Sequence, residues 1–238
     1  MNLFELLDWD SAFFGFPVGR VSSQVMDAAT LRDALQGLRA REARLVYWFA
    51  EPGERSAQLA HALQGVAVGE RILFRRALGP PSPPPTGVSV VRHEGREVPP
   101  ALDALAVQAG ALSRFAVDPA MPPGTAARMY RAWIERSVSG AIADAVYLAR
   151  ATDGTLAGMI TTARQEDCGV IGLLAVDPAF RGAGIGGALT SAAHSHFLEK
   201  GLREAEVVTQ AANRAACRLY ARSGYVAARR EAVVHFWL

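Results

Sequence analysis

Residues 173–189 read LLAVDPAFRGAGIGGAL, and this stretch decides the fold. Its apolar start predicts a buried strand that ends at Pro178, because proline cannot extend a central ladder. A glycine-rich turn then opens directly into a helical pattern. The N-terminus of a helix presents unpaired N–H groups and a positive dipole end, and both favour phosphate oxygens. The stretch therefore predicts a strand, a turn and a helix that together hold a pyrophosphate group.

The glycines of this turn match two other phosphate-binding motifs only in part. A P-loop requires Lys-Ser or Lys-Thr, and neither dipeptide occurs in the chain. Gly182, Gly184 and Gly187 have the spacing of a dinucleotide fingerprint, but too little sequence follows them for a Rossmann domain. The motif that fits in full is Arg-x-x-Gly-x-Gly, which begins at Arg181 and is preceded by a strand and by Asp177-Pro178. Arg181 adds positive charge there, and Gly184 gives an anion close access to the main chain.

A second motif follows a strand predicted at residues 207–209. It reads Asn-x-x-Ala-x-x-x-Tyr-x-x-x-Gly-Tyr and begins at Asn213. We expect Asn213 to cap the N-terminus of a helix on which Ala216 and Tyr220 share one face. Gly224 fits the position just after the end of that helix.

The two motifs resemble those of the GCN5-related N-acetyltransferase (GNAT) superfamily, and the resemblance covers essentially the whole of residues 87–238. It implies an α/β (α+β) fold with a mixed, mostly antiparallel sheet flanked by helices. It also implies that acetyl-CoA is the co-substrate, that its pyrophosphate binds at the turn and that no metal takes part. The cofactor-binding residues implied in this way are Leu174, Ala175, Val176, Arg181, Gly182, Ala183, Gly184, Ile185, Gly186, Gly187, Asn213, Ala216 and Tyr220.

The same resemblance suggests two catalytic residues. It implies that Tyr220 lies beside the sulfur of acetyl-CoA and protonates the departing thiolate; a phenol with a pKa of roughly 10 can donate a proton at neutral pH. The alternative is that Tyr220 only packs on the sheet. Free backbone groups of Leu174 and Val176 are implied to meet the thioester, which makes Leu174 the second candidate.

The sequence assigns no general base. Glu166 and Asp167 lie in a predicted tight turn, where solvated charge is expected, and the position of His235 does not identify it as a base. His194 and His196 are two residues apart on a predicted helix and point about 200° from each other, so they do not share a face as metal ligands. We expect both at the surface or its boundary.

Two shorter stretches resemble one family of this superfamily, the dTDP-fucosamine (dTDP-4-amino-4,6-dideoxygalactose) N-acetyltransferases. They are WDSAFFGFPVGRV at 9–21 and Ser113-Arg114-Phe115. The resemblance implies acetylation of the 4-amino group of a dTDP-linked amino-deoxysugar, whose diphosphate needs a cationic partner. Arg114 is the candidate for that contact, although the same residues could simply end a helix and pack its loop.

Two alternative functions stay open. One is a GNAT enzyme that acts on another amine, such as a protein N-terminus, an amino acid or an antibiotic. The other is a non-catalytic acyl-CoA sensor.

Composition limits the partners and the location. The chain has 238 residues, 50% hydrophobic and 20% charged, with a net charge of +2. This charge is too small to indicate a nucleic-acid partner, and no stretch reaches the roughly 20 apolar residues of a membrane span. The N-terminus lacks the basic region and long apolar core of a signal peptide, and Cys168 and Cys217 are isolated. We therefore expect free thiols in a cytoplasmic protein; whether it forms a homodimer stays open.

A proline run, PPSPPP at 80–85, predicts a linker at 80–86. Before it, residues 1–79 have the pattern of a small β-α-β-α-β module. After it, residues 87–238 form the predicted acetyltransferase domain, with a pair of strands at 155–164 and 170–176 ahead of the glycine-rich turn.

Overall fold

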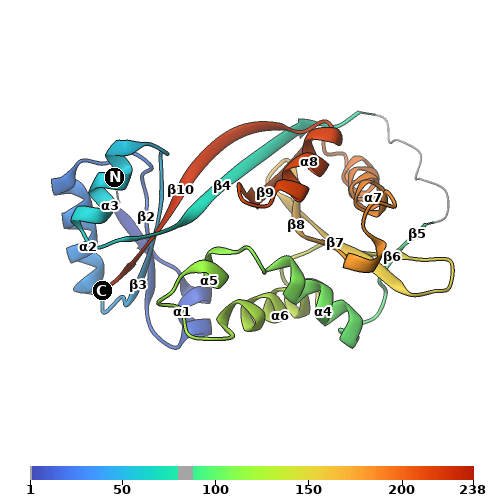
Figure 1. Ribbon diagram of the computed structural model, residues 1–238, viewed down its shortest axis with the longest axis horizontal. Coiled ribbons are helices and arrows are strands. Elements are labelled where there is room, and N and C mark those ends of the chain that lie inside the picture. The colour runs from blue at the N-terminus through green and yellow to red at the C-terminus, as the bar shows by residue number, and fades with distance from the viewer. Residues whose placement is uncertain (1, 80–87) are drawn as a thin grey trace.

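The computed structural model describes residues 2–79 and 88–238, so the linker expected at 80–86 lies outside the described residues. One ten-stranded sheet runs through the molecule in the order β1-β2-β3-β10-β4-β9-β8-β7-β6-β5 (Figure 1). In chain order the elements are β1 (Phe4–Leu6), α1 (Asp8–Phe14), β2 (Val18–Val21), α2 (Ala28–Arg39), β3 (Leu45–Ala50), α3 (Glu54–Ala62), β4 (Val66–Ala77), β5 (Ser89–Arg92), α4 (Pro100–Ala109), α5 (Arg114–Val117), α6 (Thr125–Val138), β6 (Ala145–Arg150), β7 (Leu156–Gln165), β8 (Cys168–Val176), a 3-10 turn (Pro178–Phe180), α7 (Ile185–Glu199), β9 (Glu204–Gln210), α8 (Arg214–Arg222) and β10 (Val226–Trp237).

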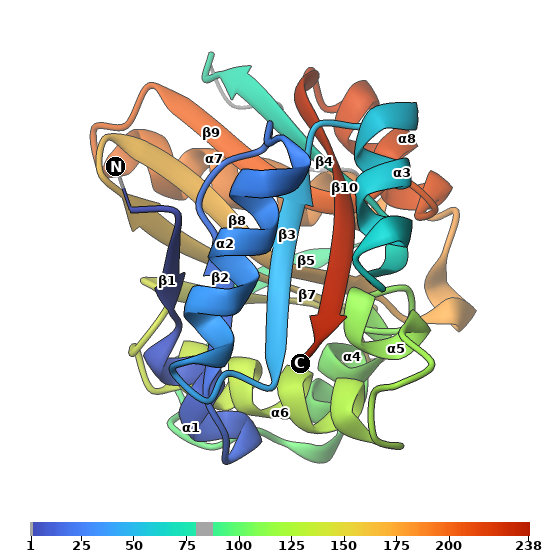
Figure 2. The same ribbon diagram turned by 90° about the vertical axis from the view of Figure 1, so that its left-hand side faces the viewer.

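Most neighbouring strands of the sheet run antiparallel. Among the described strands, only β2–β3 and β8–β9 pair in parallel. Helices cover the sheet from both sides (Figures 1 and 2). The expected mixed, mostly antiparallel sheet flanked by helices is confirmed.

Two long strands join the N-terminal and C-terminal parts of the chain. β4 pairs with β9 on one edge and with β10 on the other, and β10 also pairs with β3. In Figure 1 the two strands run together from the lobe that carries both termini to the lobe that carries α7 and α8. The strands of residues 1–79 therefore share one sheet with those of the C-terminal part. The domain boundaries expected near residues 79 and 87 stay a prediction.

Hydrophobic patterns account for most of the elements. Every residue of β3 is buried, as its uninterrupted apolar run predicts. Leu31, Leu35 and Leu38 are buried along one side of α2. The two strands expected ahead of the turn are β7 and β8, which pair antiparallel. The sequence analysis omitted β1, α1, α5 and β6; no residue of α1 is fully buried, although its Trp9, Phe13 and Phe14 pack against a core.

Two hydrophobic cores hold the C-terminal part of the sheet between two helical layers. One contains Ile160 of β7 with Ile185 and Leu189 of α7. The other contains Met159 of β7 with Leu102 of α4 and residues of α6. Because successive side chains of a strand point to opposite faces, the two cores lie on opposite sides of β7. The neighbouring strand β8 is thereby fixed between both layers.

His194 and His196 are buried, so the expectation of surface positions was wrong. His194 Nε2 lies 2.9 Å from the Tyr225 hydroxyl, and His196 Nδ1 lies 3.2 Å from the Tyr147 hydroxyl. The error arises because α7 is buried around most of its circumference rather than along one stripe. None of the described helices is long and apolar enough to cross a membrane.

Candidate active site

The parallel strands β8 and β9 separate towards their C-terminal ends. Their pairing stops at Ile171 and Val207, although β8 continues to Val176 and β9 to Gln210. Beyond this point the edge of β8 that faces β9 has no ladder partner. The two strands therefore open towards these ends, on the stretch of β8 that contains Leu174 and Val176.

A backbone donor faces this opening. The Leu173 N–H donates to Thr161 Oγ1 at 2.8 Å on the β7 side. Because successive N–H groups of a strand point to opposite edges, the Leu174 N–H faces the opened side. This is the position at which a backbone donor was expected.

The turn after β8 requires glycine at two points. Gly182 has φ 84° and Gly184 has φ 78°, a left-handed conformation that favours glycine. The helix α7 begins at Ile185, and its first intrahelical bond runs from the Ala188 N–H to the Gly184 carbonyl at 3.0 Å. The N–H groups of the preceding residues are left for an external acceptor.

The next two glycines differ in what surrounds them. A Cβ built at Gly187 meets no atom within 4 Å, so this glycine faces open space. A Cβ built at Gly186 lies 3.0 Å from the side chain of Leu219 on α8. Gly186 therefore lets two helices approach, whereas Gly187 keeps the space in front of the helix end clear.

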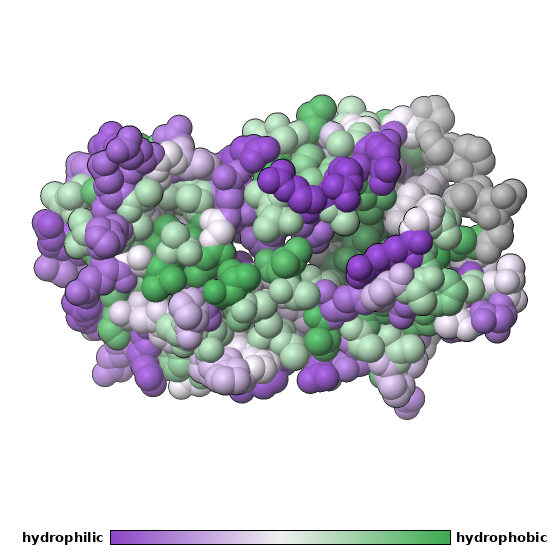
Figure 3. All heavy atoms as spheres, viewed as in Figure 1, coloured by the Kyte–Doolittle hydropathy of each residue, from purple (hydrophilic) through white to green (hydrophobic). Residues whose placement is uncertain are grey.

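A cavity of about 910 Å³, which we call the main cleft, lies between α4, the turn, α7 and α8. In the view of Figure 1 it faces the reader between α8 and α4, where Figure 3 shows a hollow with hydrophilic side chains on its rim. The predicted cofactor-binding residues line it, apart from Ala183 and Tyr220. From α4, Gln108 Nε2 reaches the end of β8 and donates to the Val176 carbonyl at 2.9 Å.

Two arginines of the main cleft were missed in the sequence analysis. Arg214 and Arg222 line the cleft together with Arg181. None of the three forms an ion pair with a carboxylate among the described residues. The signal was present, because Arg214 and Arg222 lie inside the second motif. The cleft therefore presents positive charge that no carboxylate of the described residues pairs with.

The second motif folds as predicted. The Asn213 side chain caps α8 by accepting the Ala216 N–H at 3.1 Å, and Gly224 has φ 81° just past the helix end. The Tyr220 ring packs 6.0 Å from Phe74 and 5.7 Å from Tyr225, centre to centre. Burial raises the pKa of Tyr220 far above its ordinary 10, so the phenol keeps its proton at neutral pH.

A smaller cavity of about 80 Å³, which we call the side pocket, adjoins the main cleft. The two share Ala109, Leu112, Leu174, Asn213 and Ala216 as wall residues. The remaining walls of the side pocket come from α6, β8, β9, α8 and the loop before α5. These walls are Ser113, Tyr130, Gly172, Leu173, Val208, Thr209, Gln210 and Tyr220. Tyr220 and Leu174, the two predicted catalytic residues, thus meet at one small pocket beside the main cleft.

Arg114 lies beyond the side pocket, next to Ser113. Its Cζ is 4.3 Å from the ring centre of Phe115 and 4.5 Å from that of Tyr47. Its Nε is buried and has no hydrogen-bond partner. The contacts fit both earlier interpretations, loop packing and anion binding, so the substrate-binding role of Arg114 stays a prediction.

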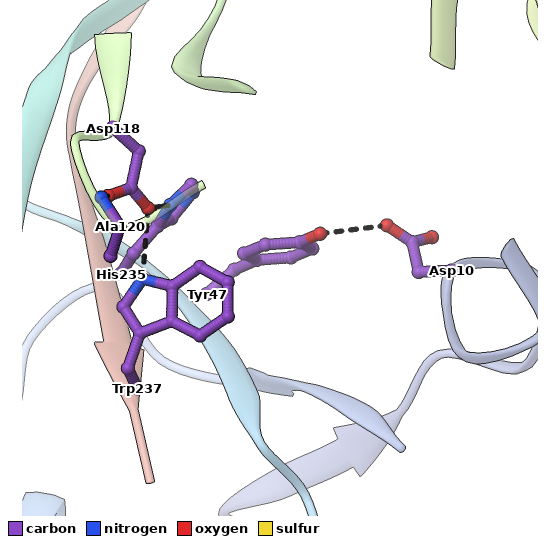
Figure 4. A network of polar contacts seen from close by, with 6 residues as sticks. All are labelled: Asp10, Tyr47, Asp118, Ala120, His235 and Trp237. Atoms are coloured by element: carbon purple, nitrogen blue, oxygen red, sulfur yellow. Dashed lines mark hydrogen bonds and ion pairs between the residues drawn. The ribbon is translucent and has the colours of Figure 1, made fainter. Parts of the chain in front are cut away.

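A buried carboxylate ties β10 to the loop after α5 (Figure 4). Asp118 Oδ2 accepts from His235 Nδ1 at 2.7 Å and from Trp237 Nε1 at 3.1 Å, and Oδ1 accepts the Ala120 N–H at 2.9 Å. Burial raises the pKa of Asp118, but these hydrogen bonds outweigh it and leave the pKa below its ordinary value. Burial lowers the pKa of His235, so its ring is neutral at pH 7. The network fixes the segment that begins with Arg114.

The three residues considered as general bases lie away from both cavities. Glu166 and Asp167 form the exposed turn between β7 and β8. The His235 side chain is fully buried against Asp118. Among the described residues that line the main cleft or the side pocket there is no Asp, Glu or His.

Comparison with known proteins supports the motifs. Residues 114–225 match the family model described as the acetyltransferase (GNAT) family. No curated protein sequence matches the chain significantly.

Solved structures share the fold at low sequence identity. A GCN5-related N-acetyltransferase from Sphaerobacter thermophilus superposes with a TM-score of 0.64 at 20% identity, covering 98% of this chain and 75% of that one. A GCN5-related N-acetyltransferase from Kribbella flavida gives 0.57 at 18% identity, with 92% and 80% covered. A putative GNAT acetyltransferase from Novosphingobium aromaticivorans gives 0.55 at 19% identity, with 99% and 88% covered. At these identities the comparisons establish the fold.

Proposed function

We propose that this chain, whose residues 114–225 match the acetyltransferase (GNAT) family model, transfers an acetyl group directly from acetyl-CoA to the amine of a small molecule. The observation that carries the proposal is the meeting of the main cleft and the side pocket at the opened end of β8. One cavity suits a long phosphorylated molecule, and the other suits the reacting amine.

The residues of the main cleft fit acetyl-CoA. The free N–H groups at the start of α7, the open space at Gly187 and the charge of Arg181 suit a pyrophosphate. Arg214 and Arg222 add two further cations that lack ion-pair partners among the described residues. The pantetheine arm would follow the free edge of β8 towards Leu174.

The chemistry falls to groups at the side pocket. The Leu174 N–H donates to the thioester oxygen and stabilises the negative charge that develops when the amine attacks. The Tyr220 phenol, kept protonated by burial, gives its proton to the sulfur as the thiolate departs. Because no carboxylate or imidazole lines either cavity in the described part of the chain, the ammonium of the acceptor loses its proton to water.

The proposed acceptor is the 4-amino group of a dTDP-linked amino-deoxysugar, with Arg114 at the diphosphate. The resemblance of residues 9–21 and 113–115 supports it, together with the buried, unpartnered Nε of Arg114. A cytoplasmic location also belongs to this proposal, and a homodimer remains compatible with it.

The test is release of the CoA thiol from acetyl-CoA with dTDP-4-amino-4,6-dideoxygalactose, run beside simple amines. Release with the nucleotide sugar alone would support both the reaction and the acceptor. Release with simple amines alone would keep the reaction and reject the sugar. Tight acetyl-CoA binding without release for any acceptor would instead favour a sensor.

A further inference from the structure

Two arginines from distant parts of the chain meet beside the side pocket. Arg71 lies on β4 and Arg114 on α5. The Cζ of Arg71 is 3.4 Å from the ring centre of Phe49, and that of Arg114 is 5.5 Å from the same centre. The two Cζ atoms are thus no farther apart than the sum of these distances. One aromatic ring carries two guanidinium groups.

Both arginines flank the side pocket. Arg71 is directly opposite Gln210 in the β4–β9 register, and opposite residues of an antiparallel pair point to the same face. Gln210 lines the side pocket. On the other flank, Arg114 directly follows Ser113, which also lines it. The arginines therefore stand at the edge of the pocket, outside the main cleft.

The charges at this edge do not balance. Glu231 on β10 pairs with Arg71 Nε at 2.5 Å and with Arg229 Nε at 3.4 Å, and only 5% of its side chain is exposed. Arg114 has no carboxylate partner among the described residues, and its Nε is buried without an acceptor. Burial, and after it the neighbouring charges of Arg114 and Arg229, lower the pKa of Arg71. Glu231 is therefore shared by Arg71 and Arg229, and Arg114 is a third guanidinium that forms no ion pair with a described carboxylate.

Packing on aromatic rings explains the position of Arg114 but not its free donor. A cation over a ring face is worth about 0.5–2 kcal/mol. That attraction acts on the charge and leaves the Nε–H, which lies out of water, without an acceptor. A buried donor without an acceptor costs free energy that a ligand oxygen would recover.

We propose that Arg71 and Arg114 together bind an anionic group of the acceptor, a diphosphate or a carboxylate, while its amine occupies the side pocket. Glu231 orients the Arg71 guanidinium for this contact. The inference rests on the proposed amine acetylation, and it makes the substrate class an acidic amine. Arg71 is the residue that the sequence analysis missed, because its partner Arg114 is adjacent only in the fold.

The first experiment measures anion binding by calorimetry on protein saturated with CoA. Saturation is needed because the main cleft would otherwise bind pyrophosphate itself. Inorganic pyrophosphate and succinate are the probes, one for each anion class. We expect one of them to bind to wild type and to bind about 10- to 100-fold more weakly to Arg114→Gln.

Arg71 is better replaced together with Glu231, because Arg71→Gln alone removes an ion-pair partner of the buried Glu231 carboxylate. Arg71→Gln with Glu231→Gln removes both partners and should weaken binding to the same degree. Arg230→Gln is the matched control: it removes the same charge from β10, and it lies on the other face because Arg230 is opposite Ile72 rather than Arg71. It should bind the probe like wild type, and all variants should bind CoA equally.

The outcomes separate this inference from the proposed function. No binding of either probe by CoA-saturated wild type would overturn it, as would an equal loss in Arg114→Gln and Arg230→Gln. Selective loss in Arg114→Gln and in the double variant would support it, even if no amine were acetylated. In that case the proposed acetylation alone would fail.

Discussion

The main cleft and the side pocket share the end of β8 as a wall, yet they are built differently. The main cleft presents backbone N–H groups, glycines and three arginines without ion-pair partners among the described residues. The side pocket is walled largely by side chains from several elements, and the arginines beside it lie on aromatic rings. The backbone N–H groups at the helix end in the main cleft can bind the phosphate of any ligand. The packed side chains around the side pocket instead fit the shape and charge of one acceptor. The difference separates what serves the cofactor from what selects the substrate.

The sharpest test of the shared wall is Tyr220→Phe. It keeps the ring packing and removes the proton, so kcat should fall about 10²- to 10⁴-fold while the affinity for acetyl-CoA stays nearly constant. Steady-state kinetics and calorimetry measure the two. Tyr225→Phe removes a neighbouring buried hydroxyl that pairs with His194, and it should spare turnover. Unchanged turnover in Tyr220→Phe would show that Tyr220 does not protonate the thiolate and only packs on the sheet.

A change confined to the main cleft should act on the cofactor alone. Gly187→Leu fills the open space beside the first turn of α7, and it should weaken acetyl-CoA binding about 10- to 100-fold. Stability should not fall, because the new side chain meets no atom near its Cβ and leucine favours helix over glycine. Calorimetry and thermal melting measure both. Glu199→Leu, in the last turn of the same helix, is the control. Normal affinity in Gly187→Leu would place the phosphates elsewhere.

A change behind the side pocket should affect the acceptor and the stability of the fold, and it should leave the binding of acetyl-CoA unchanged. Asp118→Asn loses one of two carboxylate oxygens that accept three hydrogen bonds, and it should lower the free energy of unfolding by about 1–3 kcal/mol. The acetyl-CoA affinity should not change, whereas the KM for the acceptor should rise because Arg114 loses its support. Asp167→Asn, at a fully exposed carboxylate, is the control. A fall in acetyl-CoA affinity in Asp118→Asn would contradict the division of roles between the main cleft and the side pocket.

The same variant has a pH signature. Because the pKa of Asp118 lies below its ordinary value of 3.8 in the folded chain, its stabilising effect is complete above that value. It is lost as the pH falls through the lower folded value. Melting curves of wild type and Asp118→Asn should therefore differ most near neutral pH and converge in strong acid. A constant difference would show that the charge of Asp118 is not what stabilises the fold.

The two regions also differ in how far sequence predicts them. The main cleft derives largely from the contiguous residues 173–187 and from a motif that begins at Asn213, so spacing along the chain carries its geometry. The flank of the side pocket unites Arg71 with Arg114 through a sheet register, and no local pattern encodes that. Long-range strand pairing decides such contacts.

The fold shows the same limit. Periodicity predicts β3, α2, β7 and β8, because each buries a regular face. It gives no reason to place β4, from residues 66–77, between β9 and β10 of the C-terminal part. The helix α1 was missed because its 7 residues are too few to show a helical period.

The insertion of β4 also bears on how the chain comes to be folded. During synthesis, residues 66–77 leave the ribosome long before residues 204–237, which supply both neighbours of that strand. Until then β4 has two open edges, and such edges invite pairing with other chains. Contacts between residues so distant in sequence close slowly. The nascent chain is therefore most exposed to aggregation just before its last strand is made.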